Sequence, residues 1–270
     1  MADWPIIGGG GFAKCLNFDA ATSNVDVITV GASHTKSAWV EVAETAEDYC
    51  GLNILIIRAT ANPGNNSMVD IGIGASGSQQ IILNNYLISC QYVNGATLFL
   101  PIKIPSGTKI WVRGQSNEAS GADLYVGVVG MSGDFLYSSY QVCTAYGATE
   151  GTTKGVVMSV DETVDTKGSY TEITAATERD IKHLIINGAW PYITTTANRE
   201  HLIDIAVGSE GNEIDIISNL FFWSWAGDVA WPSHYEIPIF IPAGSRLSGR
   251  AQQSYTDSGY AIELILHGLS

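Results

Sequence analysis

Short apolar stretches separated by turn residues run along the whole chain. In the first half, runs rich in Val, Ile and aromatic residues predict strands over residues 25–30, 38–42, 52–58, 68–73, 79–83, 96–104, 109–114 and 124–129. Turn signals fall between these runs, such as residues 62–66 (NPGNN) and 105–107 (PSG). The 3.6-residue period of a helix is absent, and only residues 43–49 and 175–181 suggest a single turn each.

The second half of the chain repeats the first. Residues 35–42 (TKSAWVEV) return as 166–173 (TKGSYTEI), and 69–74 (VDIGIG) return as 203–208 (IDIAVG). Residues 99–113 (FLPIKIPSGTKIWVR) return as 236–250 (EIPIFIPAGSRLSGR). The three blocks keep their order, and the offset grows slowly, as it does when small insertions fall in loops. The sequence therefore predicts a tandem duplication.

Each copy carries about eight short strand signals with hairpin turns, which is typical of a β-sandwich. The strand pattern fits both the immunoglobulin-like and the jelly-roll topology. We expect an all-β fold of two tandem β-sandwich (jelly-roll-like) domains, at residues 23–139 and 140–270, preceded by a flexible N-terminal arm over residues 1–22.

The expected arm holds an apolar patch with Trp4, Ile6 and Ile7, followed by four glycines at positions 8–11. A run of glycines forms a flexible tether. One interpretation is a docking arm that inserts into a neighbouring protein. The other is that the patch folds back on its own domain.

Charge and composition exclude several classes of partner. The chain has 13 Lys and Arg against 27 Asp and Glu, a formal net charge of −14. Nucleic-acid phosphates need a basic surface, so we expect no nucleic-acid partner, and an anionic membrane is disfavoured for the same reason. No apolar run reaches membrane-spanning length. The N-terminus also lacks the basic start and apolar core of a secretory signal.

Motifs for catalysis or cofactor binding are missing. Residues 72–77 (GIGASG) match G-x-G-x-x-G, but the residues that follow predict a strand, whereas a dinucleotide loop needs a helix there. The five histidines show no metal-ligand spacing. A β-sandwich hydrolase would need two facing carboxylates about 5–10 Å apart, which the spacing does not suggest. We therefore expect no catalytic residue, no cofactor, no metal, and a protein that is not an enzyme.

Two charged positions recur in both copies. Asp70 and Asp204 lie between apolar strand residues, while Arg113 and Arg250 end the strand after the Pro-Gly turn. A charge inside an apolar strand needs a partner, so we expect each Asp to pair with the Arg of its own domain, or both to bind loop backbone. Lys36 and Lys167 also recur, and a solvated strand face accounts for them.

The second copy is richer in aromatic residues than the first. Its additional candidates are Trp190, Tyr192, Trp225 and Trp231, while residues 221–223 (FFW) could equally fill a larger core. Exposed tryptophan suits either a platform for stacking sugars or a subunit interface.

The blocks at residues 39–42 (WVEV), 70–74 (DIGIG) and 104–109 (IPSGTK), with their second copies, resemble structural proteins of tailed-bacteriophage virions. The resemblance covers about residues 25–130 and 156–267 and implies a non-enzymatic, tail-associated or capsid-decorating component. Its expected partners are copies of itself and other virion proteins. The alternative is an extracellular carbohydrate-binding module that attaches to a glycan of the host surface.

Overall fold

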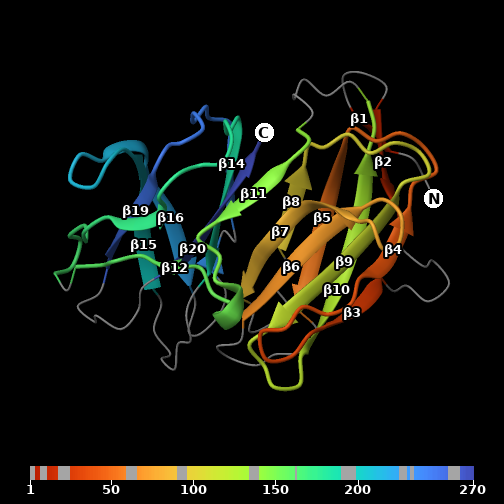
Figure 1. The fold of residues 1–270 in the computed structure, drawn as a ribbon, viewed down its shortest axis with the longest axis horizontal. Helices are drawn as coiled ribbons and strands as arrows, with labels where there is room; N and C mark the ends of the chain where they lie inside the picture. The colour runs from red at the N-terminus through yellow and green to blue at the C-terminus, as the bar shows by residue number, and fades with distance from the viewer. Residues whose placement is uncertain are drawn as a thin grey trace.

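The structure is a computed structural model that describes residues 4–6, 11–17, 25–58, 66–89, 96–133, 140–161, 163–189, 199–224, 230–231, 234–254 and 262–270. Strands dominate it, and the described residues contain no helix beyond one 3-10 turn, η1 (Glu150–Thr152). The expectation of an all-β fold is confirmed. In Figure 1 the strands gather into two groups side by side, the first half of the chain on the right and the second half on the left.

The first group is a sandwich of two antiparallel sheets. Sheet 1 has the order β1-β2-β10-β5-β8, with β3 also paired to β10, and sheet 2 has the order β4-β9-β6-β7. The strands of sheet 1 are β1 (Trp4–Ile6), β2 (Gly11–Cys15), β3 (Asp26–Val30), β5 (Gly51–Arg58), β8 (Ala96–Leu100) and β10 (Ala122–Met131). Those of sheet 2 are β4 (Val40–Glu44), β6 (Asn66–Ile73), β7 (Gln80–Ser89) and β9 (Lys109–Ser116).

The second group is built in the same way. Sheet 3 has the order β11-β20-β14-β18, with β12 also paired to β20, and sheet 4 has the order β13-β19-β15-β16-β17. The strands of sheet 3 are β11 (Cys143–Tyr146), β12 (Val156–Val157), β14 (His183–Ala189), β18 (His234–Ile237) and β20 (Glu263–Leu269). Those of sheet 4 are β13 (Thr171–Thr174), β15 (Arg199–Val207), β16 (Ile214–Ser224), β17 (Ala230–Trp231) and β19 (Leu247–Gln253).

Strand order decides between the two topologies that the sequence left open. In the first sandwich β3, β5, β8 and β10 lie in sheet 1, and β4, β6, β7 and β9 lie in sheet 2. In the second sandwich β12, β14, β18 and β20 take the places of the first set, and β13, β15, β16 and β19 those of the second. Two sheets connected in this order form a jelly roll. The two copies therefore share one topology.

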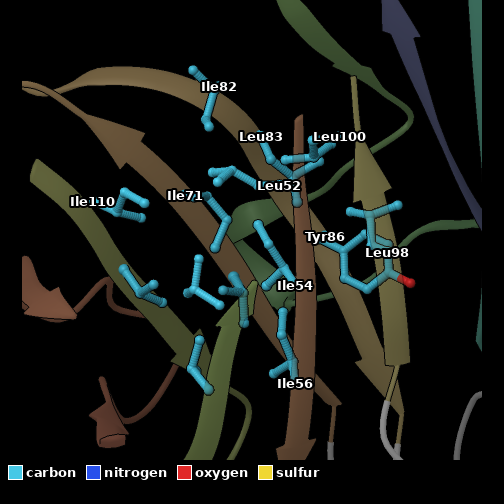
Figure 2. Packing of buried hydrophobic residues seen from close by; sticks show 14 of the residues in the cluster. Leu52, Ile54, Ile56, Ile71, Ile82, Leu83, Tyr86, Leu98, Leu100 and Ile110 are labelled. Atoms are coloured by element: carbon cyan, nitrogen blue, oxygen red, sulfur yellow. The ribbon is translucent and has the colours of Figure 1, made fainter. Parts of the chain in front are cut away.

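Apolar side chains fill the space between the sheets of each sandwich. In the first, Leu52, Ile54 and Ile56 of β5 face Ile71 of β6 and Ile110 of β9, as Figure 2 shows. All of these side chains are fully buried, and burying one Leu or Ile contributes about 1.5–3 kcal/mol to folding. Alternate residues of β5 point inward, which agrees with the period-2 pattern of the sequence.

The prediction of one helical turn at residues 43–49 and another at 175–181 is wrong. Val40–Glu44 is a strand, and Thr45 then binds the Pro-Gly turn: its carbonyl accepts from Gly107 N at 2.7 Å, and its hydroxyl accepts from Thr108 N at 2.9 Å. Thr177 binds Gly244 and Ser245 in the same way. These backbone groups are satisfied by the turn, so no helical hydrogen bonds form.

Strands also occur inside the segment expected to be an arm. β1 pairs with β2 over three residues, and β2 pairs with β10 in sheet 1. The backbone of Trp4 and Ile6 thus pairs within sheet 1, and the docking role expected for Trp4, Ile6 and Ile7 stays a prediction. Their side chains and Ile7 lie outside what the structure describes.

Candidate functional site

An ion-pair cluster lies on the outer face of sheet 2. Asp70 is buried, and Arg113 stands directly opposite it on the neighbouring strand, with Nε 2.9 Å from Asp70 Oδ2. Lys36 Nζ lies 2.7 Å from Asp70 Oδ1, and the backbone N–H of Asn85 donates to the same oxygen at 2.8 Å. The Trp39 ring covers the Arg113 guanidinium at 4.4 Å.

Sheet 4 carries the same cluster. Arg250 Nε lies 2.9 Å and Lys167 Nζ 2.8 Å from Asp204, and Asn219 N donates to this carboxylate at 2.9 Å. Tyr170 covers Arg250 at 4.5 Å. The expected pairing of Asp with Arg is present in both copies. The lysines also belong to the cluster, so the interpretation of Lys36 and Lys167 as residues of a solvated face is wrong.

The ion pairs hold Asp204 in its charged form. Burial by itself would raise its pKa, but hydrogen bonds from Lys167, Asn219 N and Arg250 outweigh burial, and the pKa lies below its ordinary value. The cluster ties the loops before β4 and β13 to the sheets behind them. It is a scaffold on which the neighbouring side chains are placed.

Beside this cluster, the first sandwich binds the second. Leu87 lies on β7, at the edge of sheet 2, and its backbone N–H and C=O bind the amide of Asn187 in sheet 3 at 2.7 and 3.1 Å. Met68 and Leu87 form one buried cluster with Ala189 and Ile265 of sheet 3. The outer face of sheet 3 is therefore covered by the first sandwich.

The segment that joins the two sandwiches completes this contact. Thr153 Oγ1 lies 2.8 Å from both His34 Nδ1 and Gln115 Nε2. Glu150 accepts from Asn85 Nδ2 at 2.9 Å through its side chain and from Gln115 Nε2 at 2.5 Å through its carbonyl. The joining segment is thus seated on sheet 2 by several side chains.

Among the described residues, no segment occupies the matching place on the second sandwich. It is a hollow of about 210 Å³, here called the Phe221 hollow, lined by Asp165, Glu200, Leu202, Phe221, Gln252, Gln253 and Ser254. The side chain of Phe221 is 44% exposed, whereas Leu87, its counterpart in the first copy, is 2% exposed. An aromatic ring is thus offered to solvent among carboxylates and amides.

A larger groove of about 600 Å³ lies on the first sandwich. Tyr140, Lys103, Gln80 and Gln141 supply its polar groups, and apolar residues such as Ile82 supply its floor. Its size suits a small molecule. Its residues do not include the ion-pair cluster or the exposed aromatic residue.

Most of the aromatic residues chosen from the sequence lie outside what the structure describes. Trp190, Tyr192 and Trp225 fall in undescribed segments, and of Trp231 only the backbone in β17 is described, paired with Trp223. Within residues 221–223, Phe222 is buried in the core, whereas Phe221 is exposed. Successive residues of a strand point to opposite faces, so Phe221 and Phe222 differ in exposure. The sequence alone does not tell which of the two faces solvent, because that depends on the orientation of the strand.

Two kinds of feature are absent from the described residues: a metal-binding cluster and a membrane-spanning helix. There, no three His, Cys, Asp or Glu side chains are grouped closely enough to hold a metal ion. In the same residues, no helix has the length and apolar character needed to span a bilayer.

No protein-family model and no curated protein matches the chain. Among solved structures it is similar to PNGase F, a glycosylasparaginase from Flavobacterium meningosepticum, at 11% identity over 96% of both chains with a TM-score of 0.40. It is also similar to the tandem CBM22-1–CBM22-2 domain of Paenibacillus barcinonensis Xyn10C, at 12% identity, 97% and 92% coverage and a TM-score of 0.29. A third is the Sulfolobus Turreted Icosahedral Virus structure, at 10% identity, 90% and 58% coverage and a TM-score of 0.21.

These structures correct one expectation. The expectation that the chain is not an enzyme does not hold, because a glycosylasparaginase is among the solved structures that it is similar to. Asp165 and Glu200, which the sequence spacing did not connect, both line the Phe221 hollow.

Proposed function

We propose that the protein is a structural component of a virus particle of the tailed-bacteriophage kind, either tail-associated or decorating the capsid. It assembles with copies of itself and with other particle proteins. The observation that supports this proposal is the exposed Phe221 hollow: the second sandwich presents to solvent a surface that the first sandwich uses to bind protein. The hollow sets the apolar side chains of Leu202 and Phe221 among polar ones, and an apolar centre with a polar rim is typical of an interaction site.

Immunogold labelling of purified particles with antibody to this protein tests the proposal. We expect regular labelling at one place on the particle, and its position on tail or head separates the two locations. Protein that is found free in the supernatant and never on intact particles would contradict a role in the virion.

A second candidate function is carbohydrate binding at a host surface, and the chemistry of the Phe221 hollow favours it. An exposed aromatic ring can stack on the apolar face of a sugar, and planar polar side chains can bind the hydroxyls around it. Asp165, Glu200 and Gln252 lie beside Phe221 in this arrangement.

A glycan array followed by calorimetry tests this second candidate. If a sugar binds in the hollow, Phe221→Ala should weaken the affinity about tenfold or more, because stacking on the ring is lost. Phe240→Ala is the matched control, since Phe240 is 63% exposed and does not line the hollow. Equal losses in the two variants, or an array without any bound glycan, would count against carbohydrate binding.

A further inference from the structure

The outer faces of sheet 2 and sheet 4 correspond to each other residue by residue. Met68 stands opposite Leu87 and Gln115, and Leu202 stands opposite Phe221 and Gln252 in the same register. The loops before β4 and β13 also match, because His34 N binds Ser116 O and Asp165 N binds Gln253 O. The residues of the Phe221 hollow are therefore the counterparts of residues on sheet 2.

On sheet 2 this surface is occupied. His34 and Gln115 bind Thr153, Asn66 Nδ2 lies 3.4 Å from Glu263 Oε2, and Met68 and Leu87 pack on sheet 3. The outer face of β14 and β20 covers this surface, together with the joining segment.

The counterpart of the covering face belongs to the first sandwich. Leu52 stands opposite Leu100 and Gly130, as Leu184 stands opposite Ile237 and Gly268. The outer face of sheet 3 thus corresponds to the outer face of sheet 1. On sheet 1, Tyr125 is 39% and Val27 51% exposed, and Leu55, Ile57 and Phe99 are half-buried.

The two open surfaces complement each other by size. The register places Gly127 and Ile57 of sheet 1 where sheet 3 has Ile265 and Ala189. In the intact chain, Ile265 and Ala189 pack on Met68 and Leu87. The counterpart of Leu87 is the larger Phe221. The counterpart of Ile265 is Gly127, which leaves space beside it. The gain in volume at Phe221 on one face is offset by the loss of volume at Gly127 on the other face, so the packed volume is retained.

One polar contact of the junction has a counterpart of matching polarity, whereas Leu55 takes the place of Asn187. Asn66 and Glu263 meet inside the chain, and their counterparts are Glu200 and Tyr125. The counterpart of an amide that donates to a carboxylate is thus a carboxylate that can accept from a phenol hydroxyl. No two carboxylates are brought together at this position.

We propose that the outer face of β15, β16 and β19 in one copy binds the outer face of β5, β8 and β10 in a second copy of this chain, in the arrangement by which the two sandwiches of one chain bind each other. This inference rests on the proposed function as an assembly component and names its partner. The contact is head to tail, so repetition builds a ring or an open chain of copies.

Sedimentation velocity of the full chain over a concentration series tests the proposal. Wild type should form a ladder of oligomers that lengthens with concentration. Phe221→Asp and Tyr125→Asp each place a charge on one of the two exposed faces and should weaken association about tenfold or more. Phe240→Asp changes an exposed residue outside the strands of both faces and should leave the ladder unchanged.

Mixing the two variants gives the sharper result. Each variant keeps one intact face, so an equimolar mixture of Phe221→Asp and Tyr125→Asp should form one-to-one dimers and nothing longer. Wild type that stays monomeric up to about 1 mM, or a mixture that forms no dimer, would overturn the inference.

A monomeric wild type whose Phe221 variant loses glycan binding would assign the hollow to sugar. Particles that are labelled although the protein does not self-associate would overturn this inference and leave the virion role standing.

Discussion

Asp204 shows how much a single buried charge organises in this fold. Its carboxylate accepts from a cross-strand arginine, from a lysine on the preceding loop and from the backbone of Asn219, which has a left-handed conformation with φ 58°. Asn85 repeats that conformation with φ 54° beside Asp70. The sequence predicts the Asp–Arg pair because both residues recur inside apolar strands. It does not predict the lysine, since a lone Lys in a loop is usually solvated.

Replacing Asp204 by Asn should therefore lower the free energy of unfolding by about 2–4 kcal/mol, because two cations lose their shared buried carboxylate. Urea denaturation measures this change. Asp215→Asn is the control: Asp215 binds the outer side of Arg250 and is more exposed, so its loss should be below about 1 kcal/mol. Equal losses in the two variants would show that burial of Asp204 is unimportant.

At the scale of elements, the strand pattern is predictable up to the point where a turn or a bulge interrupts it. The expected strand at residues 96–104 ends at Leu100 because Pro101 cannot donate to a neighbouring strand. The expected strand at 79–83 is much longer, Gln80–Ser89, because the irregularity at Asn85 shifts the alternation and hides the second half. Which outer face is covered could not be predicted, since Leu87 and Phe221 occupy equivalent apolar positions.

The edge of β7 depends on one amide. Asn187 accepts from Leu87 N and donates to Leu87 O, which satisfies two backbone groups of a strand edge that is buried between the sandwiches. Asn187→Ala leaves both groups unpaired and should lower the free energy of unfolding by about 2 kcal/mol or more.

Hydrogen exchange of the Leu87 amide measures the local part of this effect. We expect its protection to fall in Asn187→Ala, whereas the amide of Ile71 on the central strand β6 should keep its protection relative to global unfolding. Unchanged protection at Leu87 would show that solvent or another group replaces Asn187.

At the scale of the whole molecule, the junction between the sandwiches buries ionisable groups together with apolar ones. Glu263 of β20 is fully buried, with Oε2 3.3 Å from Gly155 N and 3.4 Å from Asn66 Nδ2. Burial raises its pKa to about 7, an effect that Gly155 N and Lys154 only partly oppose. His267 lies on the same face, and burial lowers its pKa to about 3. Both side chains are therefore neutral in the folded protein in mildly acidic solution.

The stability of the molecule should accordingly depend on pH through Glu263. Its pKa is raised in the folded state, so its contribution is complete below the unfolded pKa of 4.5 and is lost as the pH rises through about 7. His267 has the opposite slope below its unfolded pKa of 6.5, so wild type alone does not isolate either group. Glu263→Gln keeps the neutral shape and removes the titration. The stability of this variant relative to wild type should therefore rise by up to about 3 kcal/mol between pH 4.5 and 7 in urea denaturation. Parallel curves for the two proteins over that range would mean that Glu263 is already charged in the folded junction.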